Sequence, residues 1–134
     1  MPEQPIRVMI VDDEPRLCSA WERIISAEQD MTFVGALRTA DTIIEAVATH
    51  HPDVVLLDLI LPGRDALEAL AEVARTNPAT RVVMYSGYND EETVNKAIDN
   101  GGWGMVDKLS SPQSILDVIR RVFGGEMCFP AGYR

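Results

Sequence analysis

The sequence predicts an α/β protein with a parallel sheet covered by helices on both faces, and three observations support this. Short apolar runs alternate with amphipathic helical patterns five times along the chain. The apolar runs show little polar alternation, which is typical of strands buried on both faces. The length of 134 residues fits one domain, with no internal repeat. Strands that alternate with helices in this way favour right-handed crossovers around one parallel sheet.

The first two strand–helix units show these patterns clearly. The run 6–11 (IRVMIV) is apolar throughout and predicts a strand buried on both faces. In 15–29, apolar side chains recur at intervals of three and four residues, which predicts a helix with one apolar face. Pro15 suits the first turn of this helix. A shorter strand is expected over 32–37, at an edge of the sheet, and a helix over 41–50.

The middle of the chain contains the strongest strand signal. The segment 53–60 (DVVLLDLI) predicts a central strand because six of its residues are aliphatic and follow one another almost without interruption. It is followed by a helical pattern over 65–77. A fourth strand is expected over 80–87, ending in small polar residues, and a fourth helix over 90–101. Acidic residues in the first turn of that helix match the positive end of the helix dipole.

The last unit ends the predicted domain. A fifth strand is expected over 104–108 and a fifth helix over 111–123, where Ser111 can cap the helix and a proline follows it. We therefore assign residues 1–124 to the domain. Residues 125–134 are interpreted as a C-terminal tail or the start of a linker.

Composition restricts the classes of partner. The net charge is −9, from 21 acidic and 12 basic residues, which argues against this segment binding nucleic acid or an anionic membrane through its overall field. Cys18 and Cys128 lie far apart without a CxxC motif, so they are expected to be free thiols of a reducing cytosol. No signal peptide is evident, and no apolar run approaches the roughly 20 residues of a membrane span. We expect a cytoplasmic protein.

Polar side chains follow four of the five predicted strands. In such sheets, ligands bind outside the carboxyl ends of the strands, so residues at these ends are expected to share one site. The first strand ends at three consecutive carboxylates, and single polar groups end the third, fourth and fifth strands. These residues are Asp12, Asp13, Glu14, Asp58, Ser86 and Lys108.

This set of side chains predicts a divalent cation and a phosphoryl group. Two carboxylates about 5 Å apart repel by about 3 kcal/mol at an effective dielectric constant of about 20, and a bound cation relieves that repulsion. Oxygen ligands without clustered His or Cys favour Mg²⁺, with Mn²⁺ as a possible substitute. Lys108 and Ser86 suit the oxygens of a phosphoryl group. Asp58, alone at the end of the middle strand, is the candidate acceptor carboxylate.

Four short motifs, in this order, give the sequence a family resemblance. They are VDDEP (11–15), LLDLILPG (56–63), MYSG (84–87) and DKLSSP (107–112). Each is weak alone, but together they resemble the receiver domain of bacterial two-component response regulators over residues 6 to about 124. The resemblance implies a flavodoxin-like, doubly wound fold with strand order 2-1-3-4-5 and five helices.

The resemblance also implies a role for each residue of the site. Asp58 would accept a phosphoryl group from a sensor histidine kinase in a Mg²⁺-dependent reaction, which makes the protein a signalling switch rather than an enzyme. Asp13 would bind the metal directly and Asp12 directly or through water, while Glu14 more plausibly caps the first helix. The remaining implied contacts are the backbone carbonyl of Ile60 to the metal and the side chains of Ser86 and Lys108 to the phosphoryl group.

Several positions bear on switching. The family often has an aromatic switch residue three before the lysine, where this chain has Met105. Trp103 lies two residues earlier, so strand alternation predicts both on one face, with Trp103 either packed against a helix or presented to a partner. We also expect Tyr88 and Ile60 to hinder the hydrolytic water because bulky side chains occupy these positions.

The C-terminal segment DVIRRVFGGEMCFP resembles the junction between a receiver and its linker in regulators with a LuxR-type helix-turn-helix. That output domain is absent here, so the chain is either excised or acts alone. The resemblance implies that phosphorylation changes the surface of the fourth helix, fifth strand and fifth helix, with a possible homodimer and with DNA bound through the missing domain to control transcription. Two alternatives are an unphosphorylated adaptor and a phosphohydrolase of the haloacid dehalogenase type. The latter would need an Asp where Ile60 stands.

Overall fold

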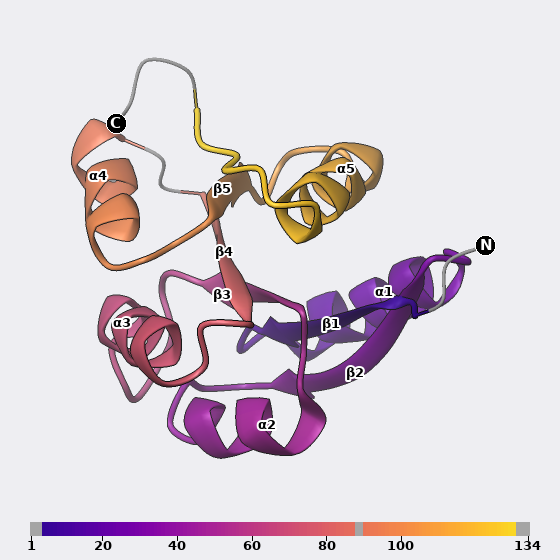
Figure 1. Ribbon diagram of the computed structural model, residues 1–134, viewed down its shortest axis with the longest axis horizontal. Helices are drawn as coiled ribbons and strands as arrows, with labels where there is room; N and C mark the ends of the chain where they lie inside the picture. Colours follow the sequence, from indigo (N-terminus) through magenta and orange to yellow (C-terminus); the bar gives the residue numbers. More distant parts are fainter. Residues whose placement is uncertain (1–3, 88–89, 131–134) are drawn as a thin grey trace.

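Five parallel strands form one sheet in the order β2-β1-β3-β4-β5, with helices on both faces (Figure 1). The computed structural model describes residues 4–87 and 90–130. The strands are β1 Ile6–Val11, β2 Met31–Leu37, β3 Val54–Asp58, β4 Arg81–Ser86 and β5 Gly104–Asp107. The helices are α1 Pro15–Ser26, α2 Ile43–His50, α3 Ala66–Thr76, α4 Glu91–Asp99 and α5 Pro112–Phe123. The predicted fold class and strand order are confirmed, and β2 lies at an edge as expected.

The sheet separates two apolar cores. One core packs α1 and α5 against alternate residues of the strands, and it contains Trp21, Val83 and Tyr85. The other packs α2, α3 and α4 against the opposite face, and it contains Met84 and Met105. Because β3 and β4 are buried on both faces, their sequences are apolar almost without interruption.

Helix and strand ends follow local side-chain chemistry. Glu14 caps α1 by accepting a hydrogen bond from the backbone N–H of Arg16 at 3.1 Å, and Ser111 caps α5 by accepting from Ser114. Both caps agree with the sequence. The strand predicted to reach residue 60 instead ends at Asp58. There the Asp58 carboxylate accepts a hydrogen bond from the N–H of Ile60 and turns the backbone out of the sheet.

The prediction that Trp103 and Met105 share one face is wrong. Met105 is 6 % exposed and belongs to the core on the α2–α4 side. Trp103 packs against the opposite core, with the Arg81 guanidinium 4.3 Å from its ring centroid. Strand alternation fails because Trp103 precedes the first residue of β5, so its backbone is outside the regular pleat. Trp103 is packed against this core but is only partly buried, so its role on a partner surface stays a prediction.

The C-terminal segment 125–130 lies along the free edge of β5. The N–H of Cys128 donates to the Trp103 carbonyl at 2.9 Å, and the N–H of Met105 donates to the Cys128 carbonyl at 3.0 Å. Gly104 permits this approach, since a Cβ there would lie 2.8 Å from the Cys128 carbonyl oxygen. The described part of the segment is thus ordered against the sheet. Its role as the start of a linker stays a prediction.

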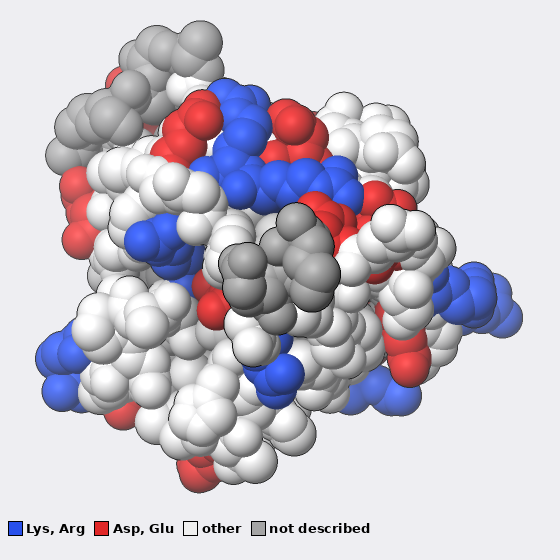
Figure 2. Space-filling model, turned by 45° about the vertical axis from the view of Figure 1, so that its right-hand side comes forward, with Lys and Arg blue, Asp and Glu red and all other residues white. Residues whose placement is uncertain are grey.

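The structure also bears on the cysteines, on membrane-spanning helices and on the surface charge. Cys18 and Cys128 are both free. Among the described residues, no helix combines the length and apolar character that crossing a bilayer requires. Figure 2 shows basic side chains interspersed with acidic ones on the face that it draws. Several of the arginines in the molecule lie in ion pairs, including Arg64, Arg120 and Arg121.

Candidate functional site

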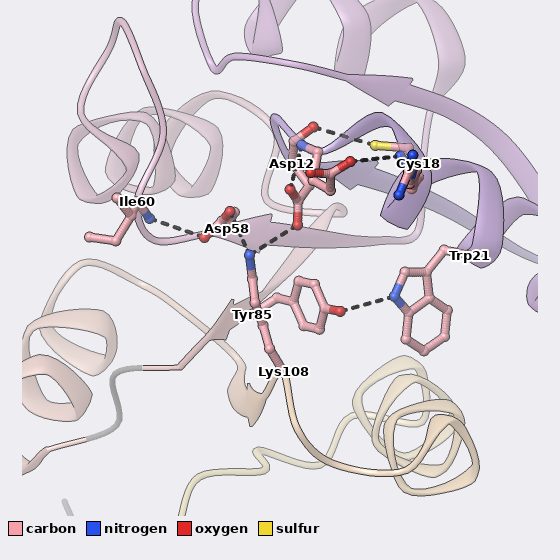
Figure 3. Close-up of polar contacts among 9 residues, drawn as sticks. Asp12, Cys18, Trp21, Asp58, Ile60, Tyr85 and Lys108 are labelled. Atoms are coloured by element: carbon pink, nitrogen blue, oxygen red, sulfur yellow. Dashed lines mark hydrogen bonds and ion pairs between the residues drawn. The ribbon is translucent and has the colours of Figure 1, made fainter.

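The carboxyl ends of β1, β3 and β5 bring Asp12, Asp58 and Lys108 together at one pole of the sheet (Figure 3). A fourth predicted site residue, Asp13, joins this group. Carboxylate oxygens of Asp12, Asp13 and Asp58 all lie within 4.8 Å of one another. Asp12 is fully buried and Asp58 is 3 % exposed, whereas Asp13 is exposed. Asp12 and Asp13 are adjacent in the sequence and Asp58 lies on a different strand, yet the three carboxylates form one group. This group is open to solvent on the side of Asp13.

Lys108 is the cation of this group. Its Nζ lies 2.8 Å from Asp58 Oδ2 and 3.2 Å from Asp12 Oδ2, and its backbone N–H donates to the Ser86 carbonyl at 3.2 Å. Partial burial acts to lower the pKa of Lys108, but its hydrogen bond with Asp58 and its attraction to both carboxylates outweigh burial. The pKa of Lys108 is therefore raised, and the side chain stays a cation at neutral pH.

Asp12 is a buried carboxylate whose negative charge is only partly compensated by its neighbours. Its Oδ1 accepts a hydrogen bond from the N–H of Glu14 at 2.9 Å. Its Oδ2 is buried and accepts no hydrogen bond from the residues that the structure describes. Its nearest cation is Lys108, which forms an ion pair with it at 3.2 Å. Burial raises the pKa of Asp12, and repulsion by Asp58 adds to that rise, while the Glu14 N–H and Lys108 oppose it.

The donor set fits a hard divalent cation. All three clustered ligands are carboxylates, and within the described part of the chain one buried oxygen of Asp12 lacks a hydrogen bond. Among the same residues, the Lys108 ammonium pairs with two of these carboxylates, so a further positive charge at this position would reduce the remaining repulsion. Mg²⁺ prefers such oxygen ligands and retains several waters, which the exposed side at Asp13 allows. The geometry of the cluster is therefore compatible with magnesium.

Asp58 is held by hydrogen bonds to both of its oxygens. Oδ1 accepts from the N–H of Ile60 at 3.1 Å, and Oδ2 accepts from Lys108. The Ile60 side chain is 61 % exposed, so it stands at the rim of the site rather than in the core. The proposed metal contact of the Ile60 carbonyl stays a prediction.

The remaining predicted site residues lie around this centre. Ser86 is buried at the end of β4, next to the β5 end that carries Lys108. Tyr88 lies outside the described residues. Met105 is buried in the core and does not reach the carboxylates; its role as a switch stays a prediction.

Two aromatic residues beneath the site escaped the sequence interpretation. The Lys108 ammonium lies 5.2 Å from the ring centroid of Tyr85, and the Tyr85 hydroxyl accepts a hydrogen bond from Trp21 Nε1 at 3.2 Å (Figure 3). The only available signal was a tyrosine in an otherwise aliphatic strand, directly before Ser86. Nothing local indicates that its ring lies below a lysine 23 residues later.

Fold and site together define a doubly wound α/β protein with an acidic pole at the carboxyl ends of its strands. The family description "Response regulator receiver domain" matches residues 8–120. The chain therefore belongs to the response regulator receiver domain family. Domains of this family are regulatory signalling domains of two-component systems.

The curated relatives include response regulators and a transcriptional regulatory protein. The chain is 32% identical over 125 residues to the nitrate/nitrite response regulator protein NarL of Escherichia coli K12, covering 93% of this chain and 58% of NarL. It is 31% identical over 129 residues to the uncharacterized transcriptional regulatory protein YxjL of Bacillus subtilis, covering 96% and 59%. The chain thus spans a little under three fifths of the length of these relatives.

Solved structures agree with this assignment. A two-component response regulator of the LuxR family from Aurantimonas sp. SI85-9A1 superposes with a TM-score of 0.87 at 26% identity, covering 93% of this chain and 89% of the other. The signal receiver domain of the putative response regulator NarL from Mycobacterium tuberculosis gives a TM-score of 0.86 at 28% identity, covering 92% and 99%.

Proposed function

We propose that this protein is a phosphoacceptor switch in which Asp58 takes a phosphoryl group from a sensor histidine kinase in a Mg²⁺-dependent reaction. The observation that supports this most strongly is the burial of Asp58 beside two further carboxylates, with Lys108 at 2.8 Å. A structural role alone does not explain why three carboxylates cluster beside the Lys108 ammonium at a strand end that Asp13 exposes to solvent.

Each residue of the site has a defined task in the proposed transfer. An oxygen of Asp58 attacks phosphorus, and the bond from phosphorus to the donor's imidazole nitrogen or acyl oxygen breaks, leaving an aspartyl phosphate. Mg²⁺ held by Asp12, Asp13 and Asp58 would supply charge compensation for the phosphoryl oxygens. Lys108 offers the same from the protein side, and Ser86 can donate a hydroxyl hydrogen bond to one oxygen.

We place the output on the surface formed by α4, β5 and α5. Phosphorylation of Asp58 places a phosphoryl group where Lys108 now contacts the carboxylate, so Lys108 must shift. Lys108 directly follows the last residue of β5. A possible homodimer, and DNA binding by a further domain of the LuxR helix-turn-helix type, would respond to this shift.

Two exposed apolar side chains support a protein donor. Leu109 follows Lys108 and is 92 % exposed, and Ile60 follows Asp58 by two residues and is 61 % exposed. Large apolar side chains at the rim of a polar site are typical of a surface that a partner covers. Leu109→Ser should leave transfer from acetyl phosphate unchanged and slow transfer from a phosphorylated kinase that accepts the parent. Equal slowing with both donors would argue against kinase docking at Leu109.

The decisive experiment weighs the intact protein after incubation with acetyl phosphate and Mg²⁺. We expect one phosphoryl adduct that hydroxylamine removes and that is absent from Asp58→Asn. Asp53→Asn is the matched control, because Asp53 lies at the opposite end of the sheet, where its carboxylate accepts a hydrogen bond from the N–H of Arg7. An adduct that persists in Asp58→Asn, or no adduct in the parent, would reject Asp58 as the acceptor.

A second measurement tests the metal. Mg²⁺ that binds the native state should raise the melting temperature of the parent, and it should have a much smaller effect on Asp13→Asn. Equal increases in both proteins would indicate that the cation binds elsewhere. A parent that binds Mg²⁺ without forming an adduct would favour the adaptor alternative.

A further inference from the structure

Tyr85 is a buried tyrosine whose ring lies directly below the reactive centre (Figure 3). It is 2 % exposed and occupies β4 immediately before Ser86. Its ring face meets the Lys108 ammonium at 5.2 Å from the centroid. Its backbone is paired in register with that of Asp58 on the neighbouring strand. Tyr85 therefore contacts Lys108 through its ring and is paired with Asp58 through its backbone.

The contact with the Tyr85 ring restricts the position of the flexible Lys108 side chain. Lys108 has a flexible four-carbon stem, and its ammonium must stay between two carboxylates, 2.8 Å from Asp58 and 3.2 Å from Asp12. An aromatic face attracts a cation through its quadrupole, and this attraction increases as the cation loses water. The side chain of Lys108 is only 29 % exposed, so the ring adds a third attractive contact from below.

The ring itself is fixed from the other side. The Tyr85 hydroxyl accepts a hydrogen bond from Trp21 Nε1 at 3.2 Å, and the two rings meet edge to face at 6.2 Å and 88°. Trp21 is 3 % exposed and belongs to α1. With its hydroxyl anchored and its ring enclosed, Tyr85 is held in one position. It is a rigid support for the ammonium rather than a side chain that swings outward.

We propose that Tyr85 is a positioning residue for phosphoryl transfer, whose ring face holds the Lys108 ammonium at the acceptor carboxylate. This inference rests on the proposed function of Asp58 for its kinetic consequence, but the contact itself is testable without any phosphoryl donor. A purely structural Tyr85 would fill the core on the α1–α5 side and satisfy Trp21, and replacing it would then change stability without changing the environment of Lys108.

The first test is spectroscopic. The chain has only two lysines, Lys96 and Lys108, and Lys96 is exposed on α4. Protons above an aromatic ring resonate upfield, so the ε-CH₂ protons of Lys108 should lie upfield of those of Lys96 in the parent. We expect Tyr85→Phe to retain this shift and Tyr85→Leu to lose it. Identical ε-CH₂ shifts for both lysines in the parent would overturn the proposal, whatever the variants do.

The second test is kinetic and uses the acetyl phosphate reaction. Tyr85→Leu should form the adduct about tenfold more slowly than the parent, and Tyr85→Phe within about twofold of the parent rate, because phenylalanine keeps the ring face. Val83→Ala is the matched control: Val83 lies two residues earlier on the same face of β4 and belongs to the same core. It should lower the melting temperature and leave the rate unchanged.

The outcomes separate this inference from the proposed function. Equal slowing in Tyr85→Phe and Tyr85→Leu would assign the effect to the hydroxyl and overturn the role of the ring. A rate loss in Val83→Ala as large as in Tyr85→Leu would mean that general destabilisation explains both. A parent that forms no adduct would reject the phosphoacceptor function, and the lysine resonances would still decide whether the ring holds Lys108.

Discussion

The two ends of the sheet use charge in opposite ways. At the amino ends of the strands, arginine side chains donate hydrogen bonds to helix carbonyls that have no partner within their own helix. Arg7 donates to the His50 carbonyl at 2.7 Å, and Arg81 donates to the Val122 carbonyl at 2.8 Å. These are carbonyls of helix C-terminal turns, where a cation is favourable. At the carboxyl ends, three carboxylates cluster beside the Lys108 ammonium, and a buried oxygen of Asp12 has no hydrogen bond from residues 4–87 and 90–130.

The same sheet is therefore stabilised at its amino end and carries electrostatic repulsion at its carboxyl end. Hydrogen bonds at the amino end and the two apolar cores hold the strands in place, so the carboxylates at the carboxyl end cannot move apart. If this comparison is right, substitutions at the carboxyl end should change chemistry more than stability. Substitutions at the amino end should do the reverse.

The largest effect is expected for Asp12→Asn. Loss of this carboxylate should slow adduct formation with acetyl phosphate and Mg²⁺ by about 100-fold, because a preorganised charge of the site is removed. Without Mg²⁺ the variant should melt at a higher temperature than the parent, because a buried carboxylate next to Asp58 disappears. Intact mass and calorimetry measure the two quantities. A lower metal-free melting temperature would contradict electrostatic repulsion at this end.

Arg81→Met tests the amino end. The variant loses hydrogen bonds to the Val122 and Phe123 carbonyls and the stacking on Trp103, which together predict a loss of about 2 kcal/mol in the free energy of unfolding. Urea denaturation measures this value, and adduct formation should stay within about twofold of the parent. Arg75→Met, on the exposed surface of α3, is the control and should be nearly neutral. If Arg81→Met kept its stability but formed the adduct slowly, the amino end would affect chemistry rather than stability, contrary to our expectation.

Gly104→Ala tests the C-terminal segment at the start of β5. The new Cβ would meet the Cys128 carbonyl oxygen at 2.8 Å, so the pairing should weaken at a cost of about 1 kcal/mol. The Cys128 thiol should then react faster with an alkylating reagent, while buried Cys18 stays slow. Gly124→Ala is the control, since its Cβ meets nothing closer than 3.4 Å. Equal alkylation rates in both variants would mean that the segment does not depend on this contact.

The smallest effect concerns the ion pair between Arg120 and Asp30. Hydrogen bonds from Arg120 lower the pKa of Asp30 below its usual 3.8, so the pair stabilises the fold above about pH 4 and loses this contribution as the pH falls through the lowered pKa. Both side chains are more than a third exposed, so the contribution is below about 1 kcal/mol. The difference in unfolding free energy between the parent and Arg120→Gln should shrink from pH 7 to pH 2. A constant difference would assign the effect of Arg120 to packing.

Much of the site followed from strand ends alone. Parallel strands put their carboxyl ends at one edge, so Asp12, Asp58 and Lys108 could be assigned to one pole from their places in the sequence. The caps at Glu14 and Ser111 were equally accessible, because a cap depends on residues three or fewer positions apart. These features are set by local spacing and by a topology that admits few alternatives.

Other features required contacts between distant segments. Strand alternation placed Trp103 and Met105 on one face, yet they pack on opposite sides because Trp103 precedes the regular part of β5. The pairing of Cys128 with β5 depends on where α5 ends and how the chain returns. Neither contact has a signature within a short window of sequence.

What the sequence by itself determined is the order of strands and helices, the polar residues at each strand end and the acidic character of the pole, because these depend on periodicity and on neighbours along the chain. Only the tertiary structure decided that Lys108 lies between Asp58 and Asp12 and that the Tyr85 ring supports the ammonium. It also decided that one oxygen of Asp12 has no hydrogen bond from the described residues. Such distances depend on strand register and on the packing of α1 against β4, which join residues that are far apart in the chain.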